Sequence, residues 1–173
     1  MGDTVKAKID SVRRDAVRRN HSAAHLLQSA LRSVLGNHVE QAGSYVDDSR
    51  VRFDFRHFSP MTPEQIEKTE AFVNEAILSG TSVDNYETSI EDAKKSGAIA
   101  LFGEKYGQRV RVVKMGNWSI ELCGGTHVSN TAKIGLFKII SESSVAAGIR
   151  RIEGTTGLGV LTLMEERDNL IKS

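Results

Sequence analysis

The only cysteine of the chain, Cys123, stands four residues before His127 in the string ELCGGTHV. Thiolate and imidazole are ligands that suit zinc in proteins. The two glycines between them give the backbone freedom to turn both side chains toward one centre. The alternative is a buried cysteine that packs as a small apolar residue beside a histidine in a turn. Taken alone, the pair favours this second interpretation.

A histidine pair, His21 and His25, lies far upstream in the string NHSAAHLL. Residues four apart share one face of a helix, so both imidazoles can contact the same ion. Alone, such a pair is more typical of helix caps or of surface residues. The metalloprotease version of the motif requires a glutamate directly after the first histidine. Ser22 occupies that position, which excludes a metalloprotease.

Together the two pairs supply one thiolate and three imidazoles, a set that suits a single Zn²⁺ ion. The sequence therefore predicts a zinc centre made by His21, His25, Cys123 and His127. Four protein ligands are typical of structural zinc, whereas catalytic zinc keeps an open position, and the sequence leaves this choice open. His38 and His57 lack such neighbours in the sequence, and we expect them to be surface or structural residues.

The elements that must position these ligands begin with helices near the N-terminus. The alternation in residues 5–10 predicts a short strand, and Asp10 is expected to cap a short helix after it. Asn20 is expected to cap a second helix, which carries the histidine pair and ends at Gly36. A further helix is predicted after Thr62, with proline at its first position.

Strands account for much of the remaining chain. Val51, Phe53 and Phe55 alternate with charged residues, which is typical of a half-buried strand. More strands are predicted in SVDNYETS, IGLFKIISES and GIRRIEGTT, and a hairpin around Gly116 joins RVRVVKMG to NWSIELC. A short helix in IEDAKKSG and a last helix in LGVLTLMEERDNLIKS complete the pattern. This irregular mixture predicts an α+β fold, a largely antiparallel sheet with helices packed on one face.

We expect residues 1–19 to be an N-terminal arm, a strand plus a short helix from an incomplete neighbouring domain, and residues 20–173 to form the domain with the zinc site. The net charge of +1 excludes a general polyanion binder, so any contact with nucleic acid must come from a local patch. A single cysteine suits a reducing compartment. The sequence has neither a long apolar run nor a signal core, and we expect a cytoplasmic protein without membrane contact.

Seven strings give the chain a resemblance to a known family: NHSAAHLL, EQAGSYV, RVRFDFRH, ALFGEKYG, ELCGGTHV, IGLFKIISES and AAGIRRIE. In this order they resemble the editing domain of bacterial alanyl-tRNA synthetases, from about Val5 to about Leu163. The threonyl-tRNA synthetase editing domain and freestanding alanyl editing proteins share the histidine and cysteine pattern. FGEKYG and CGGTH favour the alanyl group over editing of Ser-tRNA(Thr).

The resemblance implies zinc-dependent hydrolysis of tRNA(Ala) wrongly charged with serine or glycine, by a fragment of an alanine-tRNA ligase without its ATP site. It implies that the four predicted ligands bind zinc and that Gln41 belongs to the editing pocket. Gly124, Gly125 and Thr126 are expected to contact the substrate, and a zinc-linked water is expected to take part in the reaction. Without the resemblance, Gln41 is more typical of a solvated strand residue, and Thr126 of a turn residue that supports His127.

The expected partners are the acceptor end of tRNA(Ala) and the remaining synthetase domains. Arg150 and Arg151 are the predicted tRNA contacts, ahead of a cluster at Arg13, Arg14, Arg18 and Arg19 that is more typical of a solvated helix face. Two alternatives stay open: a freestanding deacylase that acts in trans, and a non-enzymatic module that binds zinc and RNA. Two departures from the family pattern, Ala24 and Ser144, leave the predicted ligands intact.

Overall fold

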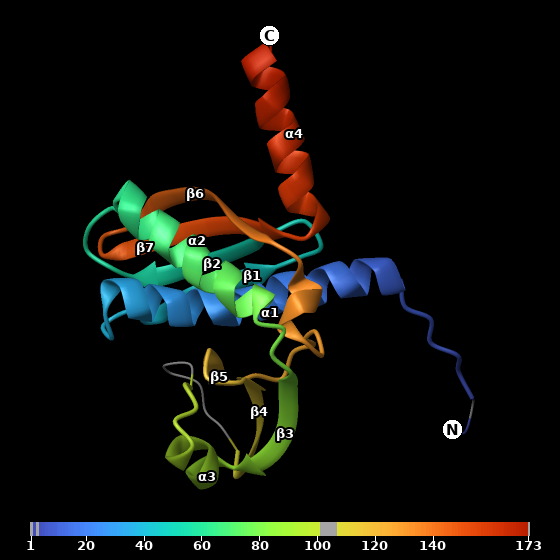
Figure 1. Cartoon of the computed structure of the whole chain (residues 1–173). Coiled ribbons are helices and arrows are strands. Elements are labelled where there is room, and N and C mark those ends of the chain that lie inside the picture. The colour runs from blue at the N-terminus through green and yellow to red at the C-terminus, as the bar shows by residue number, and fades with distance from the viewer. Residues whose placement is uncertain (1, 3, 101–106, 173) are drawn as a thin grey trace.

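A computed structural model describes residues 2, 4–100 and 107–172 and shows two antiparallel sheets with helices around them (Figure 1). The larger sheet has the strand order β1-β2-β7-β6, with β1 at Gln41–Val46, β2 at Val51–Arg56, β7 at Ile149–Thr156 and β6 at Phe137–Ala146. The smaller has the order β3-β4-β5, with β3 at Val83–Ser89, β4 at Arg109–Met115 and β5 at Ser119–Leu122. The predicted α+β class is confirmed, although its strands divide between two sheets.

Helix α1, at Ser11–Leu35, crosses the molecule between the two sheets (Figure 1). Asp10 caps it by accepting a hydrogen bond from the Arg13 amide at 3.0 Å, and Gly36 ends it at a positive φ of 116°, as predicted. The predicted break at Asn20 is wrong. Asn20 lies buried inside the helix, where its side chain bonds the Asp47 carbonyl and the Thr156 hydroxyl.

The predicted strand at residues 5–10 is also wrong, because these residues have no regular secondary structure and no partner strand. The boundary predicted after residue 19 falls within the continuous helix α1. Nothing else in the structure tests the division into an arm and a domain, which stays a prediction.

The main core lies where α1 and α2 (Pro63–Leu78) pack together on one face of the larger sheet. Thr62 and Gln65 form a reciprocal capping box at the start of α2. Leu27 and Leu31 of α1 and Phe53 of β2 are fully buried or nearly so. Each such side chain contributes about 1.5–3 kcal/mol when it leaves water. We therefore expect this core to hold α1 in place without an ion.

The smaller sheet and α3 (Ile90–Lys95) pack around a second cluster made by Ala93, Val110, Val112 and Leu122. The β4–β5 hairpin turns at Gly116, whose φ is +54°, as the sequence predicts. Cys123 follows directly after β5, and the chain then runs past α1 to a short 3-10 helix, η1, at Thr131–Ile134. The hairpin therefore delivers the cysteine to the helix that carries the histidine pair.

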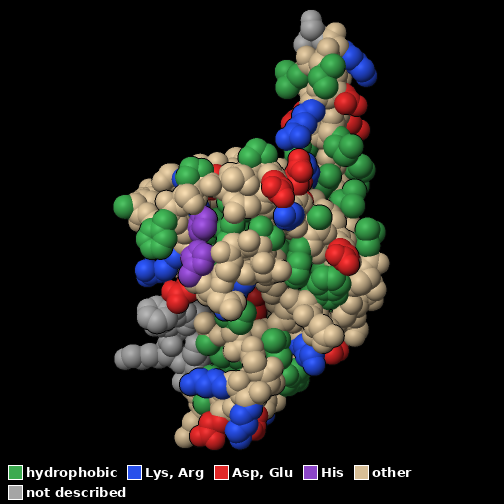
Figure 2. Space-filling view, turned by 60° about the vertical axis from the view of Figure 1, so that its left-hand side comes forward, with side chains coloured by type: hydrophobic (Ala, Val, Ile, Leu, Met, Phe, Trp, Pro, Cys, Tyr) green, Lys and Arg blue, Asp and Glu red, His purple; other side chains and the backbone are tan. Residues whose placement is uncertain are grey.

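The last helix, α4 (Leu158–Lys172), projects from the body (Figures 1 and 2). On the face drawn in Figure 2, acidic and basic side chains are interspersed, which agrees with the small net charge. No helix among the described residues is both long enough and apolar enough to cross a membrane.

Candidate metal centre

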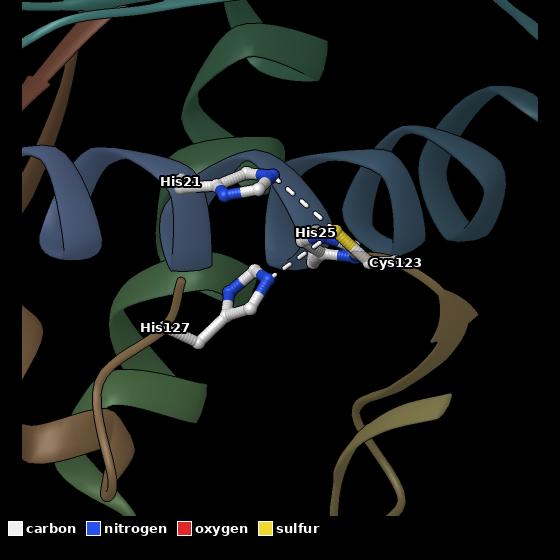
Figure 3. Close-up of side chains that lie close together, drawn as sticks. All are labelled: His21, His25, Cys123 and His127. Atoms are coloured by element: carbon white, nitrogen blue, oxygen red, sulfur yellow. Dashed lines mark hydrogen bonds between the residues drawn. The ribbon is translucent and has the colours of Figure 1, made fainter. Parts of the chain in front are cut away.

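Four side chains from two distant segments converge on one point (Figure 3). His21 and His25 lie one turn apart on α1, whereas Cys123 and His127 come from the segment after β5. One potential ligand atom from each of the four residues lies within 4.8 Å of the others. Within the described part of the chain, they form the only group of three or more such residues able to hold a metal ion.

The spacing of the donor atoms fits a tetrahedral zinc ion. The Cys123 sulfur lies 3.5 Å from His21 Nε2 and 3.4 Å from His127 Nε2. Zinc with sulfur at about 2.3 Å and nitrogen at about 2.0–2.1 Å places sulfur and nitrogen about 3.5 Å apart. One thiolate with three imidazoles is also a donor set that zinc accepts. The residues present therefore fit the ion that the sequence predicts.

Two of the histidines have polar partners on the ring nitrogen that faces away from the centre. His25 Nδ1 lies 2.6 Å from Glu121 Oε2 in a buried ion pair, although the contact lacks the angle of a hydrogen bond. His127 Nδ1 lies 3.2 Å from the Ser22 hydroxyl, which also accepts from the Val128 amide. Such partners fix the ring orientation and leave Nε2 free to bind metal.

The same contacts determine the charges in the metal-free chain. Burial raises the pKa of the Cys123 thiol, but hydrogen bonds with His127, His21 and His25 outweigh it and lower the pKa to about 3. Burial lowers the pKa of His25, but the Glu121 carboxylate outweighs it and raises the pKa to about 10. Burial lowers the pKa of His127 to about 4. At neutral pH the centre thus contains a thiolate and a neutral His127, and the proton is on His25.

The glycine turn brings the cysteine close to His21. Neither Gly124 nor Gly125 has a positive φ, so the backbone angles expected from their freedom are not the reason for glycine here. A Cβ on Gly125 would lie 2.1 Å from His21 Cε1, whereas a Cβ on Gly124 would meet nothing within 4 Å. Arg111 of β4 holds the turn by donating to the Gly125 carbonyl. Glycine is required at 125 because the imidazole occupies the space.

A cavity of about 90 Å³ adjoins the centre, lined by His21, Ala24, His25, Gln41, Ser44, Glu121, Leu122 and Cys123. Gln41 thus lies beside the metal ligands, at a point where the β1–β2 ladder shifts register. Such bulges re-aim side chains and are common next to active sites. Gly124, Gly125 and Thr126 do not line this cavity, and their predicted contact with substrate stays a prediction.

Both arginines predicted to bind tRNA are engaged within the chain. Arg150 makes two hydrogen bonds to Glu142, and Arg151 makes two to Asp54. Each pair uses two of the five N–H donors of its guanidinium group and compensates the positive charge. Their tRNA contact stays a prediction, and it requires the pairs to open or to share their donors.

His38 and His57 contact each other, away from the zinc candidate. The His38 Nε2 lies 2.9 Å from His57 Nδ1, and the two rings stack. Burial and the neighbouring His38 lower the pKa of His57. This contact agrees with the structural role expected for the two residues.

The motifs themselves contained several supporting residues to which the sequence analysis gave no role at the centre. Glu121 stands two positions before Cys123, and Ser22 directly follows His21. Ser44, which lines the cavity, lies in EQAGSYV, and Arg111 is one of the alternating residues of β4. The alternation of β5, continued by one residue beyond its end, places Glu121 and Cys123 on one side, which is a usable signal. Most of the string ALFGEKYG, at 101–106, lies outside the described residues.

Comparisons with known proteins agree with the motifs. Residues 110–153 match the family described as the threonyl and alanyl tRNA synthetase second additional domain. The chain is 58% identical over 166 residues to an alanine–tRNA ligase of Pelotomaculum thermopropionicum, covering 96% of the chain and 19% of that relative. It is 55% identical over 170 residues to the enzyme of Desulforamulus reducens, covering 98% of the chain and 19% of the relative.

A third relative, alanine–tRNA ligase 1 of Lachnoclostridium phytofermentans, is 61% identical over 160 residues, which are 92% of the chain and 18% of the relative. The chain thus spans about a fifth of the length of the curated relatives it matches. The resemblance predicted from the seven strings is confirmed over nearly the whole chain.

Proposed function

We propose that this chain, an editing region of the alanyl-tRNA synthetase family, hydrolyses the ester of tRNA(Ala) that carries serine or glycine. The observation that supports this function is the position of the metal centre at the wall of a small cavity that Gln41 also lines. The same cavity provides a space beside three candidate ligands. The tRNA(Ala) acceptor end is the proposed partner, together with the other domains of the synthetase.

The proposed reaction breaks one bond between the amino acid and the terminal ribose. The oxygen of a water forms a bond to the ester carbonyl carbon, and the ribose oxygen leaves with a proton. Bound zinc would supply a Lewis acid beside the ester or the water. The chain would hold that ion through His21, His25, Cys123 and His127, and Glu121 would orient His25. We assign no general base.

Discrimination between serine and alanine is proposed for Gln41. Gln41 lines the cavity beside the centre, and an amide group can bond a serine hydroxyl. Alanine lacks this hydroxyl and leaves the amide without a partner, which costs binding. Glycine also lacks the hydroxyl, so its acceptance rests on its smaller size. Ala24, one of the departures from the family pattern, lies in this cavity wall and adds only a methyl group.

The experiment compares the hydrolysis of Ser-tRNA(Ala), Gly-tRNA(Ala) and Ala-tRNA(Ala) by the zinc-loaded chain and by Gln41→Ala. We expect the wild type to remove serine and glycine but not alanine. Gln41→Ala should lose activity on serine more than on glycine. Gln108→Ala is the matched control, because its exposed side chain lies away from the cavity. Zinc-loaded wild type that hydrolyses none of the three would overturn the proposal.

The four-ligand set favours one alternative, a zinc module that binds RNA without catalysis, because closed sites are typical of structural zinc. In such a module Gln41→Ala would change no reaction, and removal of the ion would unfold the chain. The freestanding deacylase predicts the same hydrolysis. It differs from the main proposal only in that the 173-residue chain must act at full rate without other domains.

A further inference from the structure

A second hollow adjoins the metal centre on the side of His127. It is a recess of about 610 Å³, lined by Asp15, Arg18, Arg19, His127, Ser129 and Lys133, among others. The cavity beside Gln41 is only about 90 Å³. The centre is therefore bordered by a small cavity, which touches three of the candidate ligands, and by a large charged recess, which touches the fourth.

The recess is built from two walls. Arg18 stands three residues before His21 on α1, so it lies one turn nearer the N-terminus on the face that carries the ligand. Lys133 belongs to η1, which begins shortly after His127. The cations thus come from the same two segments that supply the ligands, and the fold that assembles the centre also assembles the recess.

The charge in the recess is largely uncompensated. Arg18 is bound to Asp15 at 3.0 Å, and its buried Nε has no hydrogen-bond partner. Among the residues that the structure describes, neither Arg19 nor Lys133 forms an ion pair with a carboxylate. Within the described part of the chain, the Lys133 ammonium group donates one hydrogen bond, to the Ser129 hydroxyl at 2.8 Å. Three cationic side chains therefore face one carboxylate.

The unpaired charge of the recess contrasts with the paired charge of the two arginines that the sequence predicted to contact tRNA. Arg150 and Arg151 each hold a carboxylate with two hydrogen bonds, and the Arg150 side chain is only 11% exposed. Lys133 is exposed and keeps donors free for an incoming anion. Of the two groups, the recess offers an anionic ligand more unpaired positive charge.

We propose that this recess binds the phosphates of the single-stranded RNA 3′ end that carries the aminoacyl ester. The inference rests on the proposed function, because an ester held at the centre requires its ribose-phosphate chain to leave past the ligands. Of the two hollows that adjoin the centre, the recess is the one with the volume for nucleotides. Phosphate contacts position the strand without reading its bases, which suits a region that receives the same terminal nucleotides on every charged tRNA.

The test uses the whole chain, zinc-loaded, and an uncharged RNA hairpin with the tRNA(Ala) acceptor stem and its single-stranded 3′ end. Binding is measured by fluorescence anisotropy at several salt concentrations for wild type, Lys133→Ala and Arg19→Gln. Lys68→Ala is the control, because it removes another exposed lysine, on α2 and outside the recess. A second hairpin without the single-stranded end is the control for the ligand.

We expect Lys133→Ala to raise the Kd of the first hairpin about fivefold and to reduce the slope of log Kd against log salt by about 0.7. Lys68→Ala should change neither, and the blunt hairpin should not distinguish the variants. With Ser-tRNA(Ala) as substrate, Lys133→Ala should raise KM and leave kcat unchanged, because the contact is equal in ground and transition states.

Equal Kd and equal salt slopes for Lys133→Ala and Lys68→Ala would overturn the inference, as would an effect that persists with the blunt hairpin. If either of these two outcomes is found and the wild type still hydrolyses Ser-tRNA(Ala), the proposed function stands and only the proposed role of the recess is refuted. If the wild type hydrolyses nothing, the proposed function fails, and the hairpin measurements still decide the role of the recess.

Discussion

Replacement of Gly125 by alanine tests how the glycine turn assembles the metal centre. The added Cβ would lie 2.1 Å from Cε1 and 2.6 Å from Nδ1 of His21. Ordinary contact begins near 3.4 Å, so the imidazole or the turn must retreat by more than about 1 Å. The turn resists this movement because Arg111 holds the Gly125 carbonyl.

The magnitude follows from the distance between the donor atoms. His21 Nε2 and the Cys123 sulfur lie 3.5 Å apart, which is already the spacing that tetrahedral zinc requires. A displacement of about 1 Å removes His21 from the ligand set. Loss of a partner that only orients a ligand already costs about 10- to 100-fold in metal affinity, and loss of a ligand should cost at least as much. We therefore expect Gly125→Ala to weaken zinc binding about a hundredfold or more.

The assay is competition for zinc against a chromophoric chelator, with circular dichroism as the control for folding. Gly124→Ala is the matched variant, because the same methyl group one residue earlier meets nothing within 4 Å. Its zinc affinity should equal that of the wild type. If Gly125→Ala bound zinc as tightly as Gly124→Ala does, the close approach of His21 to the turn would not matter for the centre.

Three further predictions concern the surroundings of the centre and of α1. Glu121→Gln removes the carboxylate that orients His25 and also lowers the pKa of His25. After correction for the proton that zinc displaces from His25, zinc binding should be weaker by about 10- to 100-fold, measured by the same competition at several pH values. The pKa of His25 is raised to about 10, whereas Cys123 is already a thiolate, so zinc must displace one proton, from His25. The zinc affinity should therefore rise about tenfold per pH unit between pH 6 and 9. A zinc affinity that does not depend on pH would contradict this protonation state. Asn20→Ala breaks the bonds from α1 to the Asp47 carbonyl and to β7, and urea denaturation should show a loss of about 1–3 kcal/mol.

The elements near the centre were predictable where local patterns determine them. Gly36 ends α1 and the Thr62 capping box opens α2, because these signals act within a few residues. The helix break predicted at Asn20 was wrong because asparagine is a common helix cap. The two distant residues that bond its buried side chain cannot be recognised from the sequence. The division of the strands into two sheets was also not predictable, since alternation shows which side of a strand is buried but not its neighbour.

The two halves of the metal centre were each visible as a spaced pair, but their union depends on tertiary structure. The contact between His25 and Glu121 exists because the end of β5 meets the middle of α1, which no local pattern encodes. The pairing of Arg151 with Asp54 likewise follows from the β2–β7 register, in which the two residues are direct partners. The sequence alone does not show that Arg151 has a carboxylate partner, so its two adjacent arginines favoured RNA binding.

The central claim is that the four ligands hold a zinc ion that hydrolysis requires, on a fold that the α1 core already stabilises. The most direct measurement follows Ser-tRNA(Ala) hydrolysis and far-ultraviolet circular dichroism together, while zinc is removed by a chelator and then restored. We predict that hydrolysis disappears and returns while the helical signal stays constant, because the buried leucines of α1 do not depend on the ion. Hydrolysis that persists in the zinc-free chain would contradict the account, as would a loss of helical signal together with the activity.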